Sequence, residues 1–252
     1  MPDVYECGIT ETNKLTDTAY SITVACNALA EEAFAGQFIH IKCGDQRLLR
    51  RPFGICGVRH DSLRFVFELK GEGTRWLSER KPGDTLDILG PLGNGFNIPD
   101  GNIIVVGGGL GAPPMLYAAQ SARGAVTAVL GFRDASRVML TDDFEKVCET
   151  VVVTTDDGSA GFCGTVEMPI EKLLNNDRYN AVLVCGQLAM QRAVALLCRR
   201  YDIPCQVSLE ERMGCGVGAC LVCVCRIRKA GTVQMNRVCK DGPVFDSREV
   251  VW

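Results

Sequence analysis

The sequence lacks the features that mark membrane, secreted or nucleic-acid-binding proteins. No apolar run reaches the roughly 20 residues that a spanning helix needs, and the N-terminus has no basic start followed by an apolar core, as a secretory signal would. The 27 Lys and Arg against 30 Asp and Glu leave no basic excess. We therefore expect a cytoplasmic protein that binds neither membranes nor nucleic acid. Its 252 residues suffice for two modest domains.

Cysteine is the residue type that stands out, with 14 in 252 residues. This content lies below the roughly 8–10% typical of a disulfide scaffold. Without an export signal the thiols should stay reduced. They are then either small apolar core residues or metal ligands.

The first 99 residues predict an antiparallel β-barrel. Short β-branched or aromatic runs at 20–26, 37–42 and 63–69 alternate with Gly and Pro. A short helix is expected over residues 75–80, with Thr74 as its cap.

Residues 100–205 predict a doubly wound α/β domain. Apolar runs at 103–106, 126–130, 151–154 and 181–185 alternate with helical patterns at 112–122, 142–147, 168–174 and 188–199. The last 47 residues, 206–252, are rich in Cys and Gly, with short strands expected at 221–227 and 232–235. They are too few for a good core of their own, so something other than packing should hold them.

Four cysteines in this last segment have the spacing C-x4-C-x2-C-x15-C, namely Cys215, Cys220, Cys223 and Cys239. The first three match the plant-type spacing of a [2Fe–2S] centre. Glycines between them permit a tight loop whose N–H groups point at sulfur. Zinc is the rival metal, although it usually takes paired C-x2–4-C knuckles, and unliganded thiols are the other alternative. Cys225 lies on a predicted strand leading away from the loop and is expected to be a buried thiol.

Two segments are candidate nucleotide sites. Gly107, Gly108, Gly109 and Gly111 follow a predicted strand and open a helix, where the backbone can approach a pyrophosphate. The next strand ends in Gly-Phe-Arg without an acidic residue, so the dinucleotide fingerprint is incomplete. Arg51 and the Gly73-Thr74 helix start could form a pyrophosphate clamp. A solvated arginine followed by a turn is the alternative.

The order of barrel, α/β domain with GGGLGAPP and Cys-rich tail resembles the ferredoxin–NADP reductase superfamily. The resemblance implies FAD binding by the residues that match its motifs, namely Arg51, Pro52, Phe53, Gly54, Val66, Phe67, Glu68, Gly73 and Thr74. It places Cys185, the first residue of CGQLAM, near the nicotinamide, with a plain strand-end Cys as the alternative. A 155–159 loop also matches. Gly54 departs from the pattern, because relatives carry a hydroxyl residue there.

The segments EERMGCGVGAC (210–220) and VCKDGPVF (238–245) are similar to the electron-transfer subunits of type B, NAD-linked dihydroorotate dehydrogenase. This resemblance implies that an FMN-bearing catalytic subunit oxidises dihydroorotate, in a heterotetramer of two copies of each subunit. Electrons would pass through [2Fe–2S] and FAD to NAD⁺ in pyrimidine (UMP) biosynthesis. FAD exchanges electrons singly or in pairs and so belongs between the one-electron cluster and the two-electron carrier NAD⁺. No side chain needs to act as acid or base.

Two alternatives remain at this point. One is a FAD/[2Fe–2S] NAD(P)H reductase subunit with a sulfur- or ferredoxin-linked partner. The other is a non-enzymatic metal-cluster regulator, which predicts no flavin. NAD and NADP are not distinguished by the residues themselves, because Arg133 could meet a 2′-phosphate.

Overall fold

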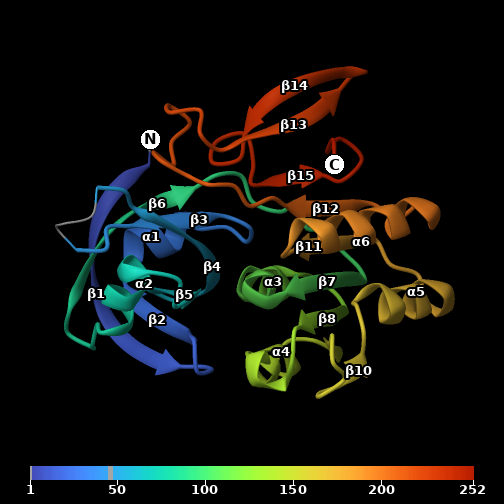
Figure 1. Ribbon diagram of the computed structural model, residues 1–252, viewed down its shortest axis with the longest axis horizontal. Helices are drawn as coiled ribbons and strands as arrows, with labels where there is room; N and C mark the ends of the chain where they lie inside the picture. The colour runs from blue at the N-terminus through green and yellow to red at the C-terminus, as the bar shows by residue number, and fades with distance from the viewer. Residues whose placement is uncertain (1, 45–47) are drawn as a thin grey trace.

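The computed structural model in Figure 1 describes residues 2–44 and 48–252. Its first part is a closed antiparallel barrel with strand order β1-β2-β5-β4-β3-β6. Alternate strand residues, such as Ile39, Ile41 and Phe65, fill its interior. The strands are β1 (Asp3–Lys14), β2 (Ala19–Ala25), β3 (Phe38–Ile41), β4 (Arg51–Arg59), β5 (Ser62–Glu68) and β6 (Thr85–Leu92), with helices α1 (Asn27–Glu32) and α2 (Glu72–Ser78) between them.

Three barrel strands were not predicted from the sequence. β1 is mostly exposed along its length, so its apolar alternation is weak. β4 and β6 contain Gly and Pro, which usually interrupt strands. The helix prediction also needs correction. α2 begins at Glu72 and Thr74 is its third residue, where Thr74 Oγ1 accepts hydrogen bonds from the N–H groups of Lys70 (2.8 Å) and Gly71 (3.2 Å).

The second part is a sheet with strand order β10-β9-β8-β7-β11-β12-β15, parallel except for β15. Alternate residues of its central strand face opposite layers. Ile103 and Val105 pack in the same cluster as α3 and α4, whereas Ile104 and Val106 pack with α5 and α6. The strands are β7 (Ile103–Gly108), β8 (Val126–Phe132), β9 (Thr150–Thr155), β10 (Phe162–Cys163), β11 (Ala181–Cys185), β12 (Cys205–Ser208) and β15 (Val244–Asp246).

The helices of this part are α3 (Ala112–Ser121), α4 (Thr141–Glu145), α5 (Glu167–Asn176) and α6 (Leu188–Arg200), with short 3₁₀ turns η1 (Gly109–Gly111) and η2 (Ala135–Arg137). The predicted fold class is confirmed. Within the described residues, α6 and every shorter helix fall short of what a bilayer crossing demands.

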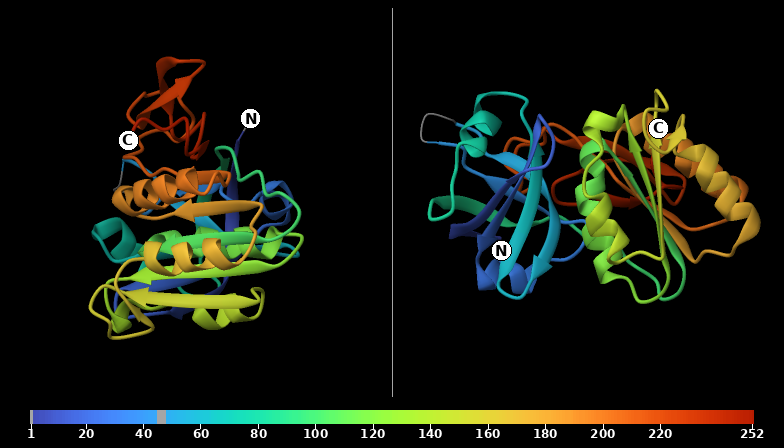
Figure 2. Two further views of the ribbon diagram at one scale, coloured as in Figure 1. Left: turned by 90° about the vertical axis from the view of Figure 1, so that its right-hand side faces the viewer. Right: turned by 90° about the horizontal axis from the view of Figure 1, so that it is seen from below.

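The Cys-rich segment is less independent than the sequence indicates. Its strand β15 pairs with β12, so it completes the α/β sheet, and Ile227, Val238 and Phe245 are buried in the same apolar cluster as β7 and β11. The expectation that packing does not hold this segment is therefore wrong, because a long-range strand pairing supplies the missing core. The ribbon of β13 (Val224–Lys229) and β14 (Thr232–Arg237) projects from the body (Figure 2), while Ile227 of β13 packs back into it. β13 begins three residues later than predicted.

Helix α3 joins the barrel to the sheet, and Figure 2 shows it between them. Tyr117 Oη donates a hydrogen bond to the Ala33 carbonyl oxygen (2.7 Å) in the barrel. A second link crosses from β5 to α4, where Arg64 Nη1 lies 2.8 Å from Asp143 Oδ2. Both links fix the two parts against each other, so the space between their open ends has a defined shape.

Candidate functional site

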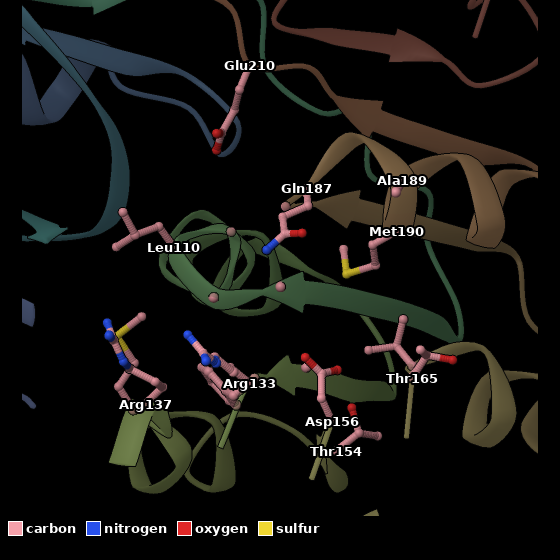
Figure 3. Close-up of a pocket in the computed structure, with 18 of the residues that line it drawn as sticks. Leu110, Arg133, Arg137, Thr154, Asp156, Thr165, Gln187, Ala189, Met190 and Glu210 are labelled. Carbon is pink, nitrogen blue, oxygen red and sulfur yellow. The ribbon is translucent and has the colours of Figure 1, made fainter. Parts of the chain in front are cut away.

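Two cavities lie where the barrel, the α/β sheet and the Cys-rich segment meet. The larger, of about 560 Å³, opens along the carboxyl ends of β7, β8 and β9 (Figure 3). The smaller, of about 240 Å³, lies between β4, β5 and the residues after β12. They share part of their walls, namely Glu68, Lys70, Leu110 and Glu210. A group in one cavity can therefore lie directly against a group in the other.

The smaller cavity collects most residues predicted to hold FAD. Its lining includes Pro52, Phe53, Gly54, Val66, Phe67, Glu68 and Thr74. Arg51 and Gly73 lie beside it rather than in its wall, and a Cβ at Gly73 would be 3.2 Å from Arg51 Nε. The predicted clamp pair is thus brought together. Sequence reasoning missed Lys70 and the 36–38 stretch, which carry no motif of their own.

The structure gives a reason for Gly54, the position that departs from related sequences. A Cβ at Gly54 would lie 3.2 Å from Cγ of Pro114, at the start of α3. This is tighter than ordinary van der Waals contact. Pro114, the second proline of GGGLGAPP, therefore occupies the space beside Gly54. The smaller cavity is bounded there by Pro114 instead of a hydroxyl group.

The Gly-rich turn lines the larger cavity through Gly108, Gly109 and Gly111. A Cβ at Gly111 would overlap the carbonyl oxygen of Cys185 on the neighbouring strand, so only glycine fits there. Gly107 lies behind the wall, where a Cβ would be 2.6 Å from the α-carbon of Ala112. Gly107 thus allows α3 to pack closely, and the other three glycines of the predicted set form the cavity surface.

The far end of the larger cavity carries charged side chains. Figure 3 shows Arg133 and Asp156 at the end opposite to Glu210. Arg133 follows β8, whereas Asp156 follows β9 and donates its backbone N–H to the Phe132 carbonyl oxygen (3.1 Å). The acidic residue absent after the second strand of this sheet is therefore present after the third.

Two groups in the cavity walls, Glu210 and Cys185, have shifted pKa values. Glu210 is exposed at the cavity surface, yet partial desolvation by the surrounding walls raises the pKa of its carboxyl, while nearby Lys70 opposes this rise. Burial, reinforced by Glu210, raises the pKa of the Cys185 thiol, which therefore stays protonated at neutral pH. Cys185 is 3% exposed and lines the smaller cavity. Its predicted place beside a nicotinamide remains a prediction.

The cysteine loop has backbone N–H groups aimed at sulfur. Cys215 Sγ accepts from the N–H groups of Ala219 (3.2 Å) and Cys220 (3.4 Å), and Cys239 donates its N–H to Cys223 Sγ (3.4 Å). Burial raises the pKa of the Cys215 thiol, but hydrogen bonds from backbone N–H groups outweigh it and lower the pKa to about 6. The N–H of Cys220 has the largest lowering effect. Such donors stabilise thiolates, the form that binds iron.

The four thiols form two pairs, Cys215 with Cys220 and Cys223 with Cys239. No three His, Cys, Asp or Glu side chains of residues 2–44 and 48–252 are arranged as ligands of one metal ion. Two pairs suit the two irons of a [2Fe–2S] centre, each of which takes two thiolates. Cys225 lies on β13 opposite Asn236 and is half-buried. The four ligands remain the predicted set.

Apolar side chains surround the cysteine loop on the outside. Val217, Leu221 and Val222 are 39%, 61% and 54% exposed, and Cys220 among them is also exposed. Neighbouring exposed apolar residues are typical of a surface that contacts another molecule.

Comparison with known sequences identifies the family. A family model described as the iron–sulfur cluster binding domain of dihydroorotate dehydrogenase B matches residues 210–251. The dihydroorotate dehydrogenase B (NAD(+)) electron transfer subunit of Desulforamulus reducens is 37% identical, with 100% of each chain covered. That of Geobacillus kaustophilus is 40% identical, with 94% of each covered. The chain belongs to the family of dihydroorotate dehydrogenase B electron transfer subunits.

Solved structures agree with this family's fold. A chain from the NADH-dependent reduced ferredoxin–NADP oxidoreductase, studied for flavin-based electron bifurcation, has a TM-score of 0.87 and 31% identity, covering 98% of this chain and 90% of that one. A ferredoxin–NADP⁺ reductase from Neisseria gonorrhoeae with bound FAD and NADP has a TM-score of 0.65 and 18% identity, covering 79% and 91%. The latter shows the fold alone. The predicted resemblance is confirmed.

Proposed function

We propose that this chain is the electron-transfer subunit of a dihydroorotate dehydrogenase B and delivers electrons to NAD⁺ in pyrimidine biosynthesis. One observation carries the proposal. The run from Glu210 to Cys215 touches both cavities and then enters the cysteine loop, because Glu210 lines both cavities and Met213 lines the smaller one. Three proposed redox sites thus lie along a run of six residues, Glu210 to Cys215, which would form one continuous route.

FAD fits the smaller cavity and the clamp beside it. Phe53 and Val66 offer apolar walls, and the Arg51 guanidinium beside Gly73 provides a charged partner for a pyrophosphate. When bound, FAD supplies the exchange between one-electron and two-electron carriers. Bound there, it would lie against the larger cavity, because Leu110 and Glu68 belong to both walls. The protein's tasks are placement and exclusion of water, and the buried Cys185 thiol, whose pKa is raised, stays protonated beside it.

The larger cavity would hold NAD, with the nicotinamide towards the shared wall. The Gly108–Gly111 turn would accept the pyrophosphate, because no other atom lies within 4 Å of the Cβ position of Gly109 and the backbone there is open to a ligand. Arg133 and Asp156 then face the adenosine end. A carboxylate at that place accepts hydrogen bonds from ribose hydroxyls and repels a 2′-phosphate, which favours NAD over NADP.

The cluster would be held by Cys215, Cys220, Cys223 and Cys239, and it supplies single-electron transfer when bound. The exposed residues Val217, Leu221 and Val222 beside it provide a surface for the electron donor. We assign this surface to an FMN-containing catalytic subunit, in a heterotetramer of two copies of each chain. The chain works in the cytoplasm.

A ferredoxin-linked reductase subunit is the second candidate, because the solved chain with 31% identity comes from a ferredoxin–NADP oxidoreductase. Both candidates use the same cofactors and differ in the electron donor. The deciding experiment is co-expression with an FMN-containing dihydroorotate dehydrogenase catalytic subunit, followed by dihydroorotate-dependent NAD⁺ reduction. Each chain alone is the control and should be inactive in this assay. Failure of the pair, together with NAD⁺ reduction by reduced ferredoxin, would favour the second candidate.

A further inference from the structure

His40 is a buried polar residue that neither cavity accounts for. It lies on β3 with 0% exposure, and neither Nδ1 nor Nε2 has a hydrogen-bond partner in the part of the chain that the structure describes. It lines neither the larger nor the smaller cavity. Burial of an imidazole with both nitrogens unsatisfied is unfavourable, so a partner outside the polypeptide is expected.

The ring of His40 lies against the cysteine loop. A Cβ at Gly216 would be 2.6 Å from His40 Nδ1 and 3.0 Å from its Cε1, so the imidazole abuts the residue that follows Cys215. Gly216 has a φ of +74°, which suits glycine for a second reason. The barrel thus provides a polar side chain directly beneath the loop that carries the first predicted cluster ligand.

The position of His40 is fixed by its neighbours. The ring packs edge-on against Phe38, with centroids 6.1 Å apart and an interplanar angle of 86°. Arg50 Nη1 donates to the carbonyl oxygens of Asp87 (3.0 Å) and His40 (3.4 Å), and Arg50 Nη2 pairs with Asp87 Oδ1 (2.7 Å). These contacts hold the backbone and ring, and leave the nitrogens free.

The ring is neutral at physiological pH. Burial, with smaller effects from Arg50 and Arg51, lowers the pKa of His40 to about 4. A neutral imidazole carries one N–H donor and one acceptor nitrogen. Cluster sulfurs are acceptors, so the donor nitrogen is the one that can serve them.

We propose that His40 donates a hydrogen bond to a sulfur atom of the [2Fe–2S] centre and thereby raises its reduction potential. The proposal rests on the cluster assignment made above. Hydrogen bonds to the sulfurs are among the factors that set the potential of an iron–sulfur cluster. The donor's positive end lies nearest the cluster, and reduction adds negative charge there. The bond therefore stabilises the reduced form more than the oxidised form.

The chain contains only two histidines, so labelling with [¹⁵N]histidine makes a direct test possible. His60 is the matched control, because it is exposed in the turn between β4 and β5 with a φ of +53° that asparagine also tolerates. Pulsed EPR of the reduced protein should show a ¹⁵N coupling to the cluster. The coupling should persist in His60→Asn and disappear in His40→Gln.

A redox titration followed by EPR gives the second readout. His40→Leu should lower the midpoint potential by an amount equal to about a tenfold change in the reduction equilibrium, or about 59 mV for one electron. His40→Gln keeps an N–H donor and should shift it less. A wild-type cluster signal without ¹⁵N coupling, or an unchanged potential in a cluster-loaded His40→Leu protein, would overturn the role of His40 alone. Absence of any cluster signal in the wild type would overturn the cluster assignment as well.

Discussion

Asp156 is expected to decide the choice between NAD and NADP. It lies at the end of the larger cavity opposite to the wall shared with the smaller one, next to Arg133 (Figure 3). With the nicotinamide at the shared wall and the pyrophosphate at the Gly-rich turn, as proposed above, the adenosine ribose would reach this end. Asp156→Ser removes the carboxylate and leaves Arg133, so a 2′-phosphate would meet positive charge without the opposing negative charge.

The size of the effect follows from two interactions. A hydrogen bond to a charged group contributes about 1.5–3 kcal/mol, and about 1.4 kcal/mol corresponds to a tenfold change. The kcat/KM for NADH should therefore fall about 10- to 100-fold. Loss of the like-charge repulsion should raise kcat/KM for NADPH by about tenfold or more, because such repulsion costs several kcal/mol. The preference for NADH should drop by at least about 100-fold.

The assay is reduction of ferricyanide by the FAD-loaded chain with NADH or NADPH as donor. Asp157→Ser is the matched control, because it makes the same charge change in the same loop. Asp157 does not line the cavity, and its Oδ1 instead accepts hydrogen bonds from the N–H (2.9 Å) and Oγ (2.6 Å) of Ser159. Equal donor preference in wild type, Asp156→Ser and Asp157→Ser would refute the placement of the ribose.

Three further predictions concern the cluster and the frame around it. Cys239→Ser should abolish or perturb the cluster while Cys225→Ser retains it, measured as iron and sulfide per chain; the reverse result would contradict the ligand set. Gly111→Ala should destabilise the fold by about 1–3 kcal/mol and raise KM for NADH, whereas Gly8→Ala, with no atom within 4 Å of its Cβ, should leave thermal melting nearly unchanged. Burial opposes ionisation of Asp143, but its arginine partner lowers the carboxyl's pKa overall. The ionised Asp143 therefore stabilises the fold at any pH above the unfolded pKa of about 3.9, and this stabilisation is lost as pH falls through the lower folded pKa. Asp143→Asn should reduce the melting temperature at pH 7 and have little effect at the acid end.

Local pattern was enough for much of the fold. Alternation of strands and helices from residue 100 onwards predicted the doubly wound sheet, because a buried parallel strand reads as a short apolar run. The barrel was predicted from three of its strands. β4 and β6 escaped notice because Pro52 and Pro91 resemble turn residues, and β1 because it is mostly exposed.

The candidate site divides in a similar way. Cys215, Cys220 and Cys223 lie on one loop, so their closeness in sequence predicts that they are close in space. Asp156 and Glu210 belong to segments far apart in sequence, and neither was assigned a role from its own motif. Their places at the two ends of one cavity depend on which strands neighbour each other in the sheet, which local periodicity does not encode.

The sequence by itself determined the ligand spacing, the Gly-rich turn and the resemblance to a redox family, because each depends on residues within one short segment. Only the tertiary structure decided that two cavities share a wall at Glu68 and Glu210, that β15 completes the α/β sheet, and that His40 lies beneath Gly216. These features arise from long-range pairing of strands and packing of the barrel against the cysteine loop. Their partners are separated by tens to more than a hundred residues, so no local pattern specifies them.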